Sequence, residues 1–400
     1  MEGSIVNIAE RKKDWQFDNG LSLTYRHYPQ YPIASVSINV LDAGSYQEET
    51  FQQNHLIEHL VYMAMKPHFA NEPDVYMSAQ TNLESAQYTC RLPAAKIINF
   101  LNHFEFAVND PDTFKDEIIE REKQAIKNEL NKPGNACNDL LPLLGWAQGV
   151  KEDWNAFDSL SSQGLKEVCT SSYISHKLHL EIAGNLSAEQ LDNLISACFQ
   201  LEKRLAGKKT NNVKLKAKQQ ASRIVISPDK HIVGYFCDLH PENNNAYLTM
   251  ACAYHLFHAS SSLGIYHNLR FDKGFIYNLI RAYHLFNGRS QFALFAQVQP
   301  QSSQAVADEL KSFFSQSNEQ LFEEHLPWAA QKCLSSQMIS METLSEVTKR
   351  ASQHYVNYQT PLDENAFYQY LQPHNLGAVK ADIQSNFFTQ ELEVISYDRD

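Results

Sequence analysis

His55, Glu58 and His59 carry the strongest chemical signal in the chain, because two imidazoles four residues apart enclose a carboxylate within an apolar run. Residues three and four apart share one face of a helix, so these three side chains would point the same way. Zinc is commonly held by imidazoles at this separation, and it needs a third protein ligand while one position stays open for water. The pattern therefore predicts a helix that carries two of three metal ligands.

The stretch 113–130 supplies candidates for the third ligand, because its pattern predicts a helix of about five turns that ends before a Pro-Gly pair. Glu122 and Glu129 fall on its apolar face, whereas Glu117 and Lys123 fall where solvent would normally be. A carboxylate on a buried face is costly unless a cation or hydrogen-bond donors meet it. The two glutamates lie two turns apart, roughly 10 Å along the axis. We therefore expect one of them to bind the metal and the other to support it.

The H-x-x-E-H motif at 55–59, followed by the pair Glu122 and Glu129, resembles the pitrilysin-type zinc peptidases, the inverzincins. The resemblance implies that His55, His59 and Glu129 bind one zinc ion per chain. It makes Glu58 the catalytic base and Glu122 the residue that orients the ligands. The 70 positions from His59 to Glu129 also agree with the spacing in that family.

Other segments resemble the same family in the same order. Residues 19–25 and 36–45 alternate with the period of half-buried strands and are similar to the two strands that precede the metal helix. Residues 172–187 are similar to the strand and turn that close the first domain. Residues 84–92 resemble the edge strand onto which relatives add an extended peptide.

Four further residues receive roles by resemblance alone. Arg270 and Tyr277 stand in a segment that looks like the signature of the second domain, and in relatives this pair reaches the substrate near the zinc. We therefore expect both to take part in catalysis and substrate binding. Ser78 and Ala79 occupy the place of an Asn-Ala pair that positions the substrate in relatives, so they are assigned to substrate binding.

Length and composition set the outer limits. A chain of 400 residues suggests two domains of near-equal size. A lysine-rich, polar stretch breaks the apolar pattern near the middle and resembles an interdomain linker. We therefore expect a zinc-binding peptidase domain at 1–205, a linker at 206–222 and a second domain of similar fold at 223–400. The resemblance implies an α+β fold, in which each domain is a mainly antiparallel sheet with helices on one face, and the two domains face each other across a cavity.

The net charge of −12 argues against nucleic acid as the main partner, because phosphate binding needs clustered positive charge. The seven cysteines are odd in number and lack C-x-x-C spacing, which is typical of reduced thiols. A secretory signal and an apolar stretch of the roughly 18 residues needed to span a bilayer are both missing. We therefore expect a soluble, cytoplasmic protein without a membrane partner. The resemblance implies a homodimer, or a heterodimer with a related subunit.

The sequence thus predicts a zinc-dependent metalloendopeptidase that hydrolyses peptides or small unfolded polypeptides with a zinc-activated water and Glu58 as general base. Where relatives usually carry Gly-Leu-Ala before the first histidine, this chain has residues 52–54, Gln-Gln-Asn. This departure and Ser78 favour an alternative, a catalytically weak peptide-binding or auxiliary subunit of a heteromeric peptidase. A zinc hydrolase of non-peptide esters or amides is a third possibility. Dedicated maturation of one precursor and general clearance of peptides would leave the same residues in place.

Overall fold

The computed structural model describes residues 12–18, 20–130, 152–205, 222–227, 231–239, 245–286, 289–388 and 392–396. These residues divide into two compact units. Unit 1 takes its described residues from 1–135, 147–213 and 340–362, and unit 2 takes them from 214–339 and 363–400. The expected linker at 206–222 lies outside the described residues except for Ser222.

Unit 1 is built on a six-stranded sheet. Its strands are β1 (Lys12–Gln16), β2 (Ser22–His27), β3 (Ala34–Leu41), β4 (Tyr76–Thr81), β5 (Ser85–Leu92) and β6 (Leu178–Gly184). They lie in the order β1-β2-β6-β3-β5-β4, and β2 and β6 are parallel while the other neighbours are antiparallel. The edge strands of this sheet are therefore β1 and β4. The expectation that residues 84–92 form the edge is wrong, because β5 pairs with β3 on one side and β4 on the other.

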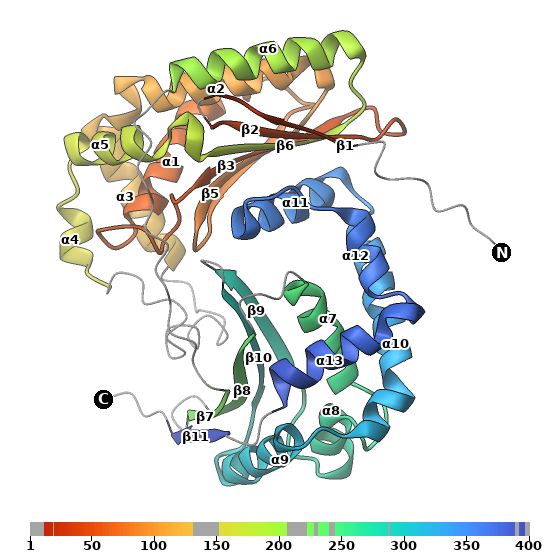
Figure 1. Cartoon of the computed structure of the whole chain (residues 1–400). Helices are drawn as coiled ribbons and strands as arrows, with labels where there is room; N and C mark the ends of the chain where they lie inside the picture. The colour runs from red at the N-terminus through yellow and green to blue at the C-terminus, as the bar shows by residue number, and fades with distance from the viewer. Residues whose placement is uncertain are drawn as a thin grey trace. The chain divides into compact units, whose positions relative to one another are not determined.

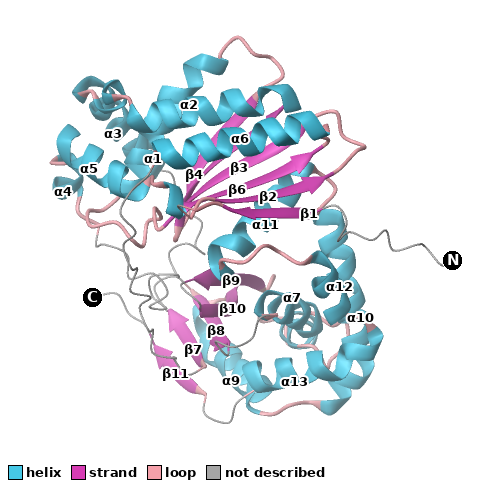
Figure 2. Ribbon diagram, turned by 45° about the horizontal axis from the view of Figure 1, so that its top comes forward, coloured by secondary structure: helices cyan, strands magenta, loops and turns pink. Residues whose placement is uncertain are grey.

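Helices cover the apolar face of this sheet. The helices of unit 1 are α1 (Gln53–Met65), α2 (Ile97–Asn109), α3 (Asp116–Leu130), α4 (Trp154–Asp158), α5 (Ser162–Ser172), α6 (Ala188–Arg204) and α11 (Leu344–Tyr358), with short turns at Lys66–Phe69, Ala94–Lys96, Pro111–Phe114 and Ser175–Lys177. Figures 1 and 2 show α1, α2 and α6 on one face. There Val36, Ile38 and Val40 of β3 are fully buried in one core with Leu56 and Leu60 of α1.

The opposite face of the sheet is polar and is covered by α11, as Figure 1 shows. The hydroxyl oxygens of Ser35 and Thr348 lie 2.8 Å apart, and Asn39 Nδ2 donates to Ser352 Oγ at 3.0 Å. Residues 340–362 therefore pack with unit 1, although they fall inside the range 223–400 that the sequence assigned to the second domain. The continuous boundaries expected from the sequence do not anticipate this return of the chain.

Unit 2 contains a five-stranded sheet in the order β11-β7-β8-β10-β9. Its strands are β7 (Arg223–Ser227), β8 (Ile232–Leu239), β9 (Ile280–Phe286), β10 (Arg289–Gln297) and β11 (Glu393–Ser396). Its helices are α7 (Ala246–Phe257), α8 (Ile265–His267), the π-helix Asn268–Asp272, α9 (Ser303–Ser315), α10 (Glu319–Ser340), α12 (Glu364–Tyr370) and α13 (Leu376–Phe387), with turns at Pro300–Ser302 and Pro373–Asn375. Phe257 and Phe292 meet in its core, their ring centroids 6.2 Å apart.

The two sheets share a plan. The order β8-β10-β9 repeats β3-β5-β4, and the parallel pair β7 and β11 repeats the parallel pair β2 and β6. They differ in two respects. β6 lies between β2 and β3 whereas β11 lies outside β7, and β1 has no counterpart among the described strands of unit 2. The predicted α+β class with mainly antiparallel sheets is confirmed.

Two composition-based expectations have structural counterparts. The six cysteines among the described residues are free and buried. None of the described helices combines the length and the apolar character that crossing a membrane requires.

Candidate metal centre

Helix α1 presents its two histidines on the side that faces away from the core. Leu56, Leu60 and Val61 are buried and hold the helix against the sheet, whereas His55 and His59 are only partly buried. The two imidazole rings lie nearly perpendicular, with centroids 4.7 Å apart. The four-residue spacing therefore brings the rings together on one face, as the sequence predicts.

Glu129, near the end of α3, completes a group of three possible metal ligands. One ligand atom from each of His55, His59 and Glu129 lies within 4.8 Å of the others, and His59 Nε2 is 3.7 Å from Glu129 Oε2. Two imidazoles and one carboxylate form a donor set that catalytic zinc sites use, with one position left for water or substrate. The Glu129 side chain is 54% exposed, so the group can be reached from solvent.

The second nitrogen of each imidazole is occupied by a protein partner. His59 Nδ1 lies 3.2 Å from Glu122 Oε2, and His55 Nδ1 lies 2.7 Å from Gln52 Oε1. These contacts leave Nε2 of both rings for a metal ion. Burial, and then the nearby His59, lower the pKa of His55 to about 4, so this ring is neutral at neutral pH. Neutral imidazole is the form that binds a metal, so the donor set fits zinc.

The two carboxylates of α3 are placed differently. Glu122 is buried, with only 7% of its side chain exposed, and it also accepts from Arg121 Nε at 2.9 Å. Glu129 approaches the His59 ring from a more exposed position. The expected division into one ligand and one supporting residue agrees with this placement, although the two roles themselves stay predictions.

Helix α3 is shorter than the sequence predicts. It begins at Asp116, because residues 111–114 form a separate 3-10 turn, whose start Asp110 caps by accepting from the Asp112 backbone N–H at 3.0 Å. Lys123 is buried instead of facing solvent, and its Nζ donates to Asp158 O at 2.7 Å and Leu160 O at 3.0 Å. The prediction for Lys123 is therefore wrong.

Glu58 lies on the same helix as the histidines but is much less accessible. Its exposed fraction is 4%, and burial raises the pKa of its carboxyl to about 8, while a hydrogen bond from Thr81 has the opposite effect. Thr81 Oγ1 donates to Glu58 Oε2 at 3.4 Å and ties the carboxylate to strand β4. A nearby divalent cation favours the ionised form of a carboxyl group. The role of proton acceptor that the sequence assigns to Glu58 stays a prediction.

The chain enters α1 through a left-handed residue. Gln52 has φ 59° and ψ 16°, and this conformation costs a non-glycine residue roughly 1–2 kcal/mol. The carboxylate of Glu48 holds this entry, accepting the backbone N–H of Gln52 at 2.9 Å and that of Asn54 at 3.3 Å. Burial raises the pKa of Glu48 to about 7, and these hydrogen bonds oppose that shift.

Ser78 and Ala79 lie on edge strand β4. Ala79 packs against the core together with Met77, so it shares a face with α1, whereas Ser78 is exposed and its hydroxyl lies 2.7 Å from Thr89 Oγ1. Tyr62 also ties α1 to this strand, because its hydroxyl donates to Met77 O at 3.4 Å. The main chain of β4 on its outer side is therefore the part of this strand best placed to meet an extended ligand.

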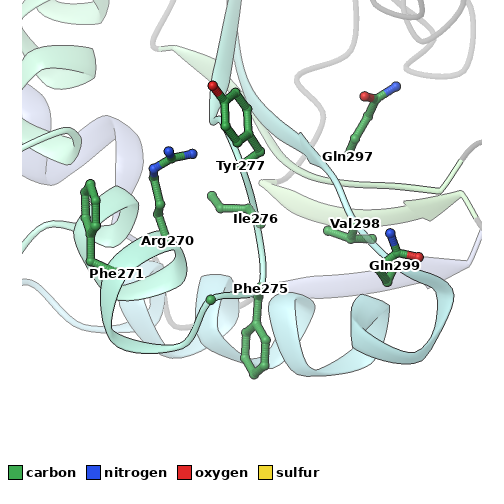
Figure 3. A pocket seen from close by; sticks show the side chains of 9 residues that line it. Arg270, Phe271, Phe275, Ile276, Tyr277, Gln297, Val298 and Gln299 are labelled. Carbon is green, nitrogen blue, oxygen red and sulfur yellow. The ribbon is translucent and has the colours of Figure 1, made fainter.

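Arg270 and Tyr277 lie in unit 2, whereas the metal ligands all lie in unit 1. The guanidinium carbon of Arg270 is 4.3 Å from the centroid of the Tyr277 ring, and Tyr277 is 81% exposed. Both line a pocket of about 610 Å³ together with Phe271, Gly274, Phe275, Ile276, Gln297, Val298 and Gln299. Figure 3 shows the arginine and tyrosine side chains beside each other in this pocket. The structure thus brings the predicted pair together.

Sequence reasoning missed three residues that hold the candidate site. Thr81 contacts Glu58, Glu48 holds the start of α1, and Gln52 contacts His55. Gln52 could have been found from its place three residues before a histidine ligand at the expected start of a helix. The contact between Thr81 and Glu58 has no local signal, because it depends on how a strand pairs 23 positions away.

Comparison with known proteins gives the following likenesses. Residues 159–327 match the family described as Peptidase M16 inactive domain. The search of curated proteins gave no match. The matched residues begin after Glu129, so they contain none of the three possible metal ligands.

Similar folds occur among solved structures. One is a peptidase M16 inactive domain from Pseudomonas fluorescens, with TM-score 0.75, 14% identity and coverage of 97% of this chain and 100% of that chain. A protease from Helicobacter pylori has TM-score 0.72 and 12% identity and covers 96% of this chain and 99% of that chain. The periplasmic protease PqqL from Escherichia coli has TM-score 0.68 and 15% identity, and the match covers 96% of this chain but 48% of that chain. At these identities the likeness establishes the fold.

Proposed function

We propose that this protein is a pitrilysin-type, zinc-dependent metalloendopeptidase, because residues 159–327 match the family described as Peptidase M16 inactive domain and the chain has the fold of a solved M16 domain. One observation carries the proposal. Ligand atoms of His55 and His59, on the helix that also bears Glu58, lie within 4.8 Å of each other and of a carboxylate oxygen of Glu129 on α3. One zinc ion per chain would be held by these three side chains.

The chemistry assigns a role to each residue. A zinc ion held by His55, His59 and Glu129 would act as a Lewis acid and would lower the pKa of a bound water to about 7. Glu58 accepts the proton of the attacking water and passes it to the leaving amine. Glu122 keeps the His59 ring oriented through its 3.2 Å contact with Nδ1. By resemblance, Tyr277 and Arg270 stabilise the developing oxyanion and hold the substrate.

A peptide is the substrate class that best suits strand β4. This strand is one of the two edges of its sheet, and Thr81 and Tyr62 fix its position relative to α1. An extended peptide can add to such an edge through main-chain hydrogen bonds, which tolerate varied side chains. Ser78 and Ala79 would then contact the substrate mainly through their backbone, because the Ser78 hydroxyl is paired with Thr89.

Zinc analysis combined with a peptidase assay tests the proposal. We expect about one equivalent of zinc per chain, cleavage of quenched peptides that is lost on chelation, and recovery on zinc addition. The Glu58→Gln variant should keep its zinc and lose activity by at least about 100-fold, because the general base is gone. Glu117→Gln, at an exposed position on α3, is the control and should retain activity. A wild-type protein that binds no zinc would refute the proposal.

A second candidate is an auxiliary subunit that binds peptides without cleaving them. It is favoured by the matched family's description as an inactive domain, and by Gln52 and Ser78, which depart from the residues of relatives. The same assays separate the candidates, because a zinc-loaded protein that binds peptides but never cleaves them supports the auxiliary role. Turnover of small esters or amides without peptide cleavage supports a non-peptide hydrolase.

We also propose that the protein acts as a dimer. The structural match to the Escherichia coli protease PqqL covers 96% of this chain but only 48% of PqqL. The fold of this chain therefore corresponds to about half of that longer chain. Two copies of this chain, or one copy and a related subunit, would together correspond to the full length of PqqL. For a homodimer, light scattering of the purified protein should give about twice the mass of 45.7 kDa expected from the sequence. A protein that is monomeric when purified alone but is recovered from the cell together with a related subunit supports the heterodimer.

A further inference from the structure

Gln52 occupies a place for which its residue type is poorly suited. It is the N-cap of α1, yet its side chain makes no hydrogen bond to the backbone of the helix. Asn, Asp, Ser and Thr are preferred at an N-cap because their short side chains cap the first turn, and glycine is preferred where the backbone is left-handed. Gln52 offers neither advantage. The residue must therefore be explained by what its side chain contacts.

The side chain of Gln52 contacts the first candidate metal ligand. Its Oε1 lies 2.7 Å from Nδ1 of His55, one turn further along the chain. An amide oxygen only accepts hydrogen bonds, so His55 Nδ1 carries the proton and donates it. The lone pair of the neutral ring is then on Nε2, the nitrogen left for the ion.

The left-handed backbone is what makes this contact available. Two hydrogen bonds hold the backbone of Gln52: its N–H donates to Glu48 Oε1 at 2.9 Å, and its carbonyl oxygen accepts from the Leu56 N–H at 3.0 Å. The next turn is held by Asn54, whose Nδ2 donates to Gly44 O at 2.7 Å. From this fixed backbone, the Gln52 side chain extends along the first turn of α1 and reaches His55.

We propose that Gln52 is the positioning residue of His55, which selects the Nδ1–H tautomer and directs Nε2 towards the metal. The inference rests on the proposed zinc site and adds to it a neutral partner for one imidazole. His59 has the carboxylate of Glu122 in the corresponding place. The two ligands are thus oriented by partners of different charge, and residue 52 sets how strongly the site holds its ion.

Substitutions at position 52 test this role. Gln52→Gly suits the left-handed backbone but removes the acceptor, so zinc affinity should fall by about 10- to 100-fold, the usual loss when an orienting partner is removed. Gln52→Glu keeps an acceptor oxygen at the same reach and should bind zinc at least as tightly as the wild type. Gln359→Gly is the matched control, because Gln359 is also left-handed, with φ 53°, but lies at the end of α11. It should leave zinc affinity unchanged.

Two measurements separate positioning from a general effect on folding. Competition with a chromophoric chelator gives the zinc affinity, and ¹H–¹⁵N correlation spectra of the metal-free protein give the tautomer of His55. We expect the Nδ1–H tautomer in the wild type and a mixture of tautomers in Gln52→Gly. Equal zinc affinity and an unchanged tautomer in Gln52→Gly would overturn the inference alone. A wild-type protein without zinc affinity would overturn the proposed function as well, so the two failures can be told apart.

Discussion

At the scale of single residues, the candidate centre depends on side chains that would not touch the ion. Glu122 has one oxygen on His59 and the other on Arg121, so its carboxylate is held from both sides. It is also buried, which makes its interaction with the imidazole less screened than that of an exposed carboxylate. The orientation of the His59 ring therefore depends on Glu122 as well as on its own helix.

Replacement of Glu122 by Gln tests this dependence. The amide keeps the shape but loses the negative charge that raises the basicity of the His59 ring, so zinc affinity should fall by about 10- to 100-fold. Chelator competition measures the change, and Glu117→Gln on the exposed face of α3 is the control. Equal affinities in the two variants would contradict the role of Glu122.

Thr81 has a comparable role for Glu58. The Thr81 hydroxyl donates a hydrogen bond to Glu58 Oε2 at 3.4 Å. Thr81→Val keeps the shape of the side chain and removes the donor, and we expect kcat to fall by up to about 10-fold, which corresponds to about 1.4 kcal/mol. Zinc affinity should not change, because Thr81 contacts no ligand. A loss of zinc instead of kcat would mean that β4 supports the metal and not the base.

At the scale of elements, α11 makes an unusual contact, because a helix normally covers the apolar face of a sheet. It packs on polar strand positions, and the ring of its Tyr355 stacks on His179 of β6 with centroids 3.5 Å apart. His179 is fully buried, and burial lowers its pKa. His354 of the same helix has its pKa lowered to about 4 by burial and by nearby cations, with Arg26 the largest of these.

The lowered pKa values of His179 and His354 predict that the packing of α11 on the sheet weakens in acid. Between pH 6.5 and about 4 the unfolded chain binds a proton at His354 that the folded chain does not, so stability falls as the pH falls through this window. Each such histidine changes the free energy of unfolding by at most about 1.4 kcal/mol per pH unit. Hydrogen exchange of α11 should therefore accelerate below pH 6.5. His354→Gln should reduce the effect, and His374→Gln, at an exposed position of unit 2, should not.

The sequence predicts elements whose burial is decided locally and fails where a distant segment covers them. The apolar spacing of α1 and the burial of Glu122 follow from a helical pattern, and both agree with the structure. Ser35 and Asn39 alternate with buried residues and look like a solvent-facing side, but α11 covers them from more than 300 positions away. No period-2 pattern contains that information.

Lys123 illustrates the same limit in one residue. A lysine on a helix is read as exposed, yet this one is buried, and the end of α4 and the turn after it supply two backbone carbonyls to its ammonium group. Lys123→Met should destabilise the protein by about 1–3 kcal/mol, since both carbonyl oxygens lose their buried donor. Lys127→Met removes only a more exposed ion pair with Asp158 and should change stability by less than about 1 kcal/mol. Urea denaturation of the two variants measures the difference, and similar values would contradict the role of Lys123.

At the scale of the whole molecule, the order of the chain couples the two units. The residues of unit 2 from 214 to 339 are synthesised before residues 340–362, which complete unit 1. The last part of unit 1 can therefore dock only after most of unit 2 exists. The metal ligands do not share this dependence, because His55, His59 and Glu129 all precede residue 135.

Zinc should therefore stabilise one unit selectively. A ligand that binds only the folded state adds about 2.7 kcal/mol at 100 times its dissociation constant. His55, His59 and Glu129 form the one group of three or more possible metal ligands among the described residues, and they connect α1 to α3. Hydrogen exchange of the metal-free and zinc-loaded protein should show protection in these two helices and little change in α7 of unit 2, and His59→Gln should abolish the difference. Equal protection of both units, or protection that survives in His59→Gln, would place the ion elsewhere.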